Sequence, residues 1–139
     1  CDAGTYAVAG IMGGQETTMQ DRAVLALNLG PPSRATSSLE AALFALFDGH
    51  GPHGHIVSEL LANSIVTVFR RGLIQEKPHS VLQCIRDAFR ELENRVMQSD
   101  ASVREYSGAS GTVAIVAAGH LIVAGVGDTT AVLGSCSSE

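Results

Sequence analysis

The chain has 139 residues, of which 45% are hydrophobic, so its size and composition fit one domain, or part of one, that buries a core. Its formal net charge is −5 and its nine Lys and Arg residues are scattered, which argues against nucleic acid as the main partner because phosphate binding needs clustered cations. The longest apolar stretch, Thr112 to Val126, is interrupted by Gly119 and His120 and is too short to span a bilayer.

The three cysteines, Cys1, Cys84 and Cys136, lie far apart in the sequence. An odd number without close spacing does not predict a disulfide framework or a structural zinc site. No basic and then apolar leader is visible near the N-terminus. These features favour reduced thiols and a location in the cytoplasm or the nucleus.

Apolar runs that stop at Gly, Pro or Asp-Gly predict strands in the first third of the chain. The third run could be helix or strand by pattern alone, but its length and the Asp-Gly that follows favour a buried strand. The predicted strands are Tyr6–Met12, closed by Gly13-Gly14, then Ala23–Leu29 and Ala41–Phe47, with a polar loop at Ser33–Ser38.

The middle of the chain predicts two amphipathic helices. Apolar residues recur at three-to-four spacing from Ile56 to Phe69, and Gly72 suits a C-terminal stop. Ser80 and Gln83 fit a capping box at the start of the second helix. Its apolar stripe runs to Val96, and the mixed charges on its other face indicate a solvated surface rather than a binding patch.

The last third predicts a small-residue loop followed by three strands. The order of strands, two long helices and strands indicates an α+β domain with antiparallel pairing. The chain stops at Glu139, just after the last predicted strand, so we expect residues 1–139 to be a partial domain. The loop is Asp100–Ser110 and the strands are Thr112–Ala118, Leu121–Val126 and Thr130–Leu133, the first two joined by a Gly119-His120 turn.

The stretch from Phe47 to Gly51, Phe-Asp-Gly-His-Gly, carries the most chemistry. An apolar strand delivers the carboxylate of Asp48 to its own end, and the neighbouring glycines let the backbone turn and approach an ion closely. A carboxylate with an exposed glycine carbonyl offers the hard oxygen ligands that suit Mg²⁺ or Mn²⁺. His50 could donate a proton to a leaving oxygen. Taken alone, however, an Asp-Gly turn after a strand is common.

Three further motifs accompany this stretch in a fixed order. Met19-Gln20-Asp21-Arg22 precedes it, Ser110-Gly111-Thr112 opens a later strand, and Gly125-Val126-Gly127-Asp128 closes another. Together the four motifs resemble those of the metal-dependent Ser/Thr protein phosphatases of type 2C (the PPM family), whose pattern is Met-Glu-Asp, Asp-Gly-His-Gly-Gly, Ser-Gly-Thr-Thr and Val-Gly-Asp-Ser-Arg. The resemblance extends from about Tyr6 to Leu133 and corresponds to the N-terminal half of such a domain.

The resemblance implies an αββα fold, an antiparallel β-sandwich flanked by helices, here incomplete. It also implies hydrolysis of phosphoserine or phosphothreonine by a water that two Mg²⁺ or Mn²⁺ ions activate. By the same resemblance Asp48 bridges the two metals, the Gly49 carbonyl binds one of them, and His50 is the general acid. Asp21 matches the second acid of Met-Glu-Asp, and Asp128 an acid of a further, weaker metal site.

The departures from the family pattern predict an impaired or inactive chain. Gln20 stands where the family has Glu, and Gln15 where it has the phosphate-binding Arg, whose forked, charged contact an amide cannot make. Pro52 replaces a Gly and Thr130 an Arg. The family also places two more metal-binding Asp residues further along than Glu139.

Plainer interpretations stay open for several of these residues. Asp21 and Asp128 would equally well stabilise turns by accepting backbone N–H groups. Gln15 and Gln20 could simply face solvent, and the other two histidines of this region, at positions 53 and 55, are expected in water at the start of the first helix.

Three functional hypotheses follow. One is an active phosphatase whose other half lies outside this chain, acting on a phosphoprotein. Another is a pseudophosphatase that keeps the fold and binds a regulatory protein partner. The last is a non-functional fragment, which would expose strand edges and aggregate. For the chain as printed, the sequence favours inactivity.

Overall fold

The computed structural model describes residues 11–12, 15–16, 18–27, 29, 41–74, 81–117 and 119–135. Four antiparallel strands form one sheet in the order β3-β4-β5-β6, and a two-stranded ribbon pairs β1 with β2. The elements are β1 (Ile11–Met12), β2 (Gln15–Glu16), β3 (Asp21–Ala26), β4 (Ala41–His50), α1 (Gly54–Ile74), α2 (Val81–Met97), α3 (Ala101–Tyr106), β5 (Gly108–Ala117) and β6 (His120–Val126).

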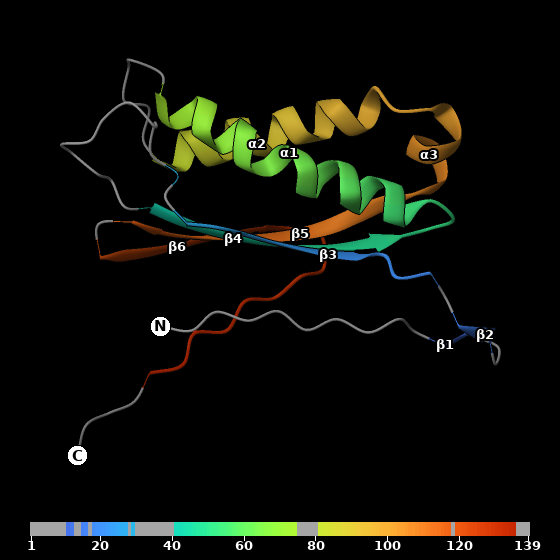
Figure 1. Cartoon of the computed structure of the whole chain (residues 1–139), viewed down its shortest axis with the longest axis horizontal. Helices are drawn as coiled ribbons and strands as arrows, with labels where there is room; N and C mark the ends of the chain where they lie inside the picture. Colours follow the sequence, from blue (N-terminus) through green and yellow to red (C-terminus); the bar gives the residue numbers. More distant parts are fainter. Residues whose placement is uncertain are drawn as a thin grey trace.

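The two long helices cover one face of the sheet, and α1 lies directly on it while α2 packs on α1 (Figure 1). Side chains alternate across a strand, so every second residue of β4 faces the helices. Leu43, Ala45 and Phe47 are buried on that face, against Val113 and Ile115 of β5. The core therefore lies between the sheet and α1.

The helices are held by apolar packing and by polar contacts between them. From α1 the buried residues include Leu61, Ile65 and Phe69, and from α2 they are Ile85, Ala88 and Leu92. Arg95 of α2 donates to the Ser64 hydroxyl of α1 at 3.2 Å and pairs with Glu91 at 3.0 Å. This packing explains the apolar stripes that the sequence shows.

The face of the sheet opposite the helices is apolar and open. Leu46 of β4 is 57% exposed, and Leu25, Val116 and Val123 from the other strands are also exposed. The resemblance places the second sheet of a sandwich on this face, so the described residues form one sheet layer of that architecture. The predicted α+β class with an incomplete antiparallel sandwich is confirmed.

Several predicted boundaries move. β3 begins at Asp21 and ends at Ala26. α1 continues past Gly72 to Ile74, because one glycine destabilises a helix by only about 1 kcal/mol and α2 packs alongside it. At this point the Cys84 thiol of α2 lies 3.7 Å from the Gly72 carbonyl oxygen. His120 already belongs to β6 and pairs with Ala117, while Gly119 has the positive φ expected of the turn, 74°.

Two predictions near the C-terminus are wrong. The predicted loop Asp100–Ser110 contains α3, because Val103 is buried and draws the segment onto the core. Thr130–Leu133 is not a strand: Val132 is 91% exposed, and the described residues give this segment no strand to pair with. The predictions for Tyr6–Gly10, Gly13-Gly14, Ser33–Ser38, Ser80 and the two terminal cysteines lie outside the described residues.

No helix in the described ranges combines the length and the apolar content that crossing a bilayer requires.

Candidate active site

The four sequence motifs meet in one row across the sheet. Asp21 of β3 is the register partner of Asp48 of β4, and Asp48 is the partner of Ser110 of β5. Gly127, which directly follows β6, lies next to Ser110. If Gly127 had a Cβ atom, that atom would be only 2.7 Å from the Cβ of Ser110. Residues that are up to 106 positions apart thus lie side by side at one end of the open face.

Asp21 and Asp48 form a pair of like charges. Burial raises the pKa of Asp21 above the usual value of an aspartate, and the negative charge of Asp48 and a side-chain hydrogen bond with it raise the pKa further. The guanidinium of Arg22 opposes the rise. Two carboxylates in contact repel when both are ionised, and a cation between them would relieve the repulsion.

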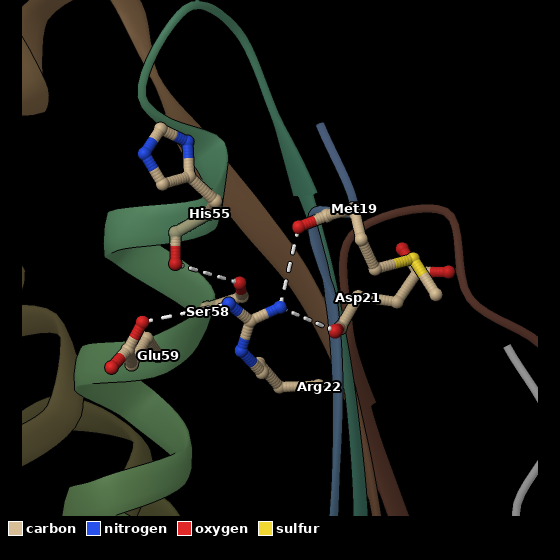
Figure 2. A network of polar contacts seen from close by, with 6 residues as sticks. All are labelled: Met19, Asp21, Arg22, His55, Ser58 and Glu59. Carbon is tan, nitrogen blue, oxygen red and sulfur yellow. Dashed lines mark hydrogen bonds and ion pairs between the residues drawn. The ribbon is translucent and has the colours of Figure 1, made fainter. Parts of the chain in front are cut away.

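Arg22 fixes the start of β3 from the other side of the strand. Its Nη1 donates to the carbonyl oxygens of Met19 at 3.3 Å and Asp21 at 2.9 Å, and its Nη2 lies 3.5 Å from Glu59 Oε2 on α1. Figure 2 shows this guanidinium on the α1 side and the Asp21 carboxylate on the opposite side of β3. In the first turn of α1, the Ser58 hydroxyl donates to the His55 carbonyl at 3.2 Å.

Gln20 does not join the two carboxylates. Its backbone carbonyl accepts from Gly49 N–H at 3.2 Å, and its side-chain Oε1 is buried at the start of α1, where a Cβ on Gly54 would lie 2.0 Å away. That Oε1 has no hydrogen-bond partner among the described residues. Gln20 therefore places a neutral amide beside the N-terminus of α1, at the position where the family has a charged Glu.

Gly49 is needed for close contact between β4 and α1. A Cβ at this position would lie 2.4 Å from the Gly54 carbonyl oxygen and 2.8 Å from the Gln20 carbonyl oxygen, distances that real Cβ atoms do not show. The next glycine, Gly51, has a φ of 84° and turns the chain toward α1. The glycines on both sides of His50 thus allow this segment to lie close to the backbone of neighbouring elements.

His50 ends β4 and pairs with Gly108 of β5. It lines a cleft of 770 Å³ together with residues of the three helices and the sheet. The other two histidines of this region were expected in water, but both are half-buried, and the Nδ1 atom of His55 is buried without a partner among the described residues. Their ring centroids, on His53 and His55, are 6.4 Å apart.

The remaining predicted residues lie at the edges of the row. Asp128 and Thr130 are exposed after Gly127, and between them Thr129 brings its hydroxyl against that of Thr112. Gln15 belongs to β2, and its side chain is outside the described part of the chain.

The donor set suits a hard divalent cation but is small. Two carboxylates in contact, Asp21 and Asp48, provide the oxygen ligands that Mg²⁺ and Mn²⁺ prefer. In the described ranges no three His, Cys, Asp or Glu side chains gather closely enough to hold a metal ion. Asp128 is therefore not brought into the pair.

Sequence reasoning missed Arg22, although it is part of the quoted motif, because charged residues on a strand usually face solvent. It also missed Ser107 and Gly108, which lie in the predicted loop and contact the His50 segment. A two-residue Ser-Gly signal is too common to single them out.

The family model of protein phosphatase 2C matches residues 7–139. The chain belongs to the protein phosphatase 2C family. Two curated relatives come from Arabidopsis thaliana: probable protein phosphatase 2C 72 is 29% identical over 135 residues, and probable protein phosphatase 2C 61 is 32% identical over 140 residues. Probable protein phosphatase 2C 72 of Oryza sativa subsp. japonica is 33% identical over 113 residues.

The matches cover most of this chain but a minor part of each relative. The three alignments include 91%, 95% and 76% of the chain, yet only 38%, 39% and 28% of the respective relatives. The chain thus spans less than half the length of these protein phosphatase 2C relatives.

Proposed function

We propose that the chain supplies the Asp21–Asp48 half of a protein phosphatase 2C site that hydrolyses phosphoserine or phosphothreonine in a phosphoprotein. The observation that carries the proposal is the contact between these two carboxylates, which belong to register partners on neighbouring strands. Strand pairing holds two like charges together on an open face, an arrangement that costs stability unless a cation offsets it.

Asp21 and Asp48 would hold Mg²⁺ or Mn²⁺, with the Gly49 carbonyl as a further oxygen ligand. When bound, such ions supply an activated water and neutralise charge on the phosphoryl group. Hydrolysis breaks the bond between phosphorus and the seryl or threonyl oxygen, and that oxygen needs a proton. His50, two residues beyond Asp48, is the group proposed to donate it.

The proposed activity is impaired relative to the family. Gln15 cannot make the forked, charge-assisted contact that an Arg makes with phosphate. Gln20 removes a negative charge beside the start of α1, and its buried Oε1 has no hydrogen-bond partner among the described residues. Asp128 stays a proposed ligand of a weaker, additional site.

A second candidate function is a pseudophosphatase that binds a regulatory protein. It is favoured by the small donor set, since no cluster of three potential metal ligands occurs in the described ranges. Location in the cytoplasm or nucleus also stays a prediction under either function.

The test is release of inorganic phosphate from a phosphothreonine peptide by the full-length protein with Mg²⁺ or Mn²⁺. Activity that EDTA abolishes, and that Asp48→Asn lowers by about a hundredfold or more, supports the phosphatase. Asp100→Asn, the same change of charge at the start of α3, serves as the control and should leave the rate unchanged. No phosphate release at any metal concentration would reject the phosphatase and favour the second candidate.

A further inference from the structure

The segment that carries His50 rests on the junction between α3 and β5. The backbone N–H of His53 donates to the Ser107 hydroxyl at 2.8 Å. Gly51 lies so close that a Cβ there would meet the Tyr106 carbonyl oxygen at 2.1 Å and the Ser107 Cα at 2.9 Å. The two segments are 54 residues apart at the Ser107 contact, so a tertiary contact and not local sequence places the loop after β4.

The imidazole of His50 lies over Gly108. A Cβ on Gly108 would be 2.7 Å from Nε2 and 3.0 Å from Cε1 of that ring. Real Cβ atoms essentially never come this close, so any side chain at position 108 has to displace the ring. The absence of a side chain at 108 thus sets where the imidazole can lie.

We propose that Ser107 and Gly108 are positioning residues that fix the imidazole of His50 for proton donation, an inference that rests on the phosphatase function proposed above. Ser107 anchors the backbone that follows His50, and Gly108 leaves the space that the ring occupies. Neither residue touches the phosphoryl group in this account, because both act through His50.

Ser107 is itself connected to the core through α3. Its backbone N–H donates to the Val103 carbonyl at 3.0 Å, which caps the C-terminus of α3. Val103 is buried in the core and α3 contacts α1. A chain of contacts therefore runs from the core through Val103 and Ser107 to the His50 segment. Misplacement of a catalytic group by about 1 Å can cost a hundredfold in rate, so such an anchor matters for proton donation.

The position of the ring can be measured without catalysis. We would record proton NMR of the full-length protein with Mg²⁺ rather than paramagnetic Mn²⁺, and assign the His50 ring by the loss of its signals in His50→Asn. The expected result is a nuclear Overhauser contact between the ring protons of His50 and the Hα protons of Gly108. Its absence in the unaltered protein would overturn the proposal.

Variants separate positioning from general stability. Ser107→Ala should lose the ring contact to Gly108, and Ser107→Thr, which keeps the hydroxyl, should restore it. Gly108→Ala should displace the ring, whereas Gly134→Ala, where a Cβ would meet nothing within 4 Å, should not. A folded Ser107→Ala protein that keeps the contact at full strength would overturn the proposal, and if that variant does not fold, Gly108→Ala decides by the same readout.

Kinetics provide the second readout. With a phosphothreonine peptide, Ser107→Ala and Gly108→Ala should lower kcat about tenfold or more while KM stays within about twofold, and Ser107→Thr should recover kcat. Equal kcat in all variants would contradict the proposal. If the unaltered protein releases no phosphate, the phosphatase function fails, but the NMR contact still decides whether Ser107 and Gly108 place the ring.

Discussion

Removing one charge from the Asp21–Asp48 pair should stabilise the protein in the absence of divalent cations. Side chains of directly paired residues in antiparallel strands have Cβ atoms about 4.5–5.5 Å apart. Two unit charges at about 4 Å repel by about 1 kcal/mol in water, and exposed pairs are measured at about 0.2–1 kcal/mol. Because both residues are exposed overall and Asp21 is only partly desolvated, we expect Asp21→Asn to raise the free energy of unfolding by only about 0.5 kcal/mol at pH 7.

The pH dependence gives this prediction its sign. The folded state raises the pKa of Asp21 above 3.8, so it favours the protonated carboxyl. That contribution to stability is fully present below pH 3.8 and is lost as the pH rises through the raised pKa. The advantage of Asp21→Asn should therefore be absent at pH 3 and complete at pH 7.

The assay is urea unfolding, followed by circular dichroism, with EDTA present. Asp48→Asn should behave like Asp21→Asn, and the control Asp100→Asn should stay within about 0.5 kcal/mol of the unaltered protein at both pH values. Adding Mg²⁺ should reverse the order, because the unaltered pair binds the cation and the variants bind it less well. Destabilisation by Asp21→Asn at pH 7 in EDTA would refute the repulsion on which this reasoning depends.

Five more substitutions test how the fold holds the site, each by urea unfolding. Gly49→Ala should lower the free energy of unfolding by about 1–3 kcal/mol, because the added methyl group would overlap the carbonyl of Gly54, the first residue of α1. Arg22→Ala should lower the free energy of unfolding by about 1–3 kcal/mol, because the carbonyls of Met19 and Asp21 lose their hydrogen-bond donor. Glu59→Gln removes only an exposed ion pair and should lower the free energy of unfolding by less than about 1 kcal/mol. In a protein of residues 1–139, Leu43→Ala in the core should lower the free energy of unfolding by about 2–5 kcal/mol, against less than about 1 kcal/mol for Leu46→Ala on the open face.

Each of these has an outcome that would count against it. A Gly49→Ala protein as stable as the parent would mean that β4 and α1 separate easily. Equal losses for Arg22→Ala and Glu59→Gln would assign the effect to the ion pair. A loss at Leu46 as large as that at Leu43 would show that the open face is covered in solution.

The long helices and the sheet strands were predictable because their patterns are regular. Apolar residues at three-to-four spacing located α1 and α2 to within a few residues. The run that forms β4 shows no polar alternation, because Phe44 and Leu46 on the open face are apolar too, and only its length and the Asp-Gly that follows indicated a strand. Residues 101–106 contain mostly small and polar side chains, so the helix that Val103 anchors there had no local signal.

The sequence singled out the residues of the candidate site but not their arrangement. The motifs named Asp21 and Asp48, yet their direct pairing is a matter of strand register, which depends on which face each strand buries. Ser107 and Gly108 act through contacts over 50 residues in sequence, and no local pattern marks such contacts.

Binding of Mn²⁺, followed by isothermal titration calorimetry, tests most directly whether Asp21 and Asp48 together form a metal site. The unaltered full-length protein should release or absorb heat in a saturable titration, and Asp21→Asn and Asp48→Asn should each weaken the binding by about tenfold or more while Asp100→Asn leaves it unchanged. Binding of equal strength in all four proteins, or no binding to the unaltered protein, would contradict the site described here.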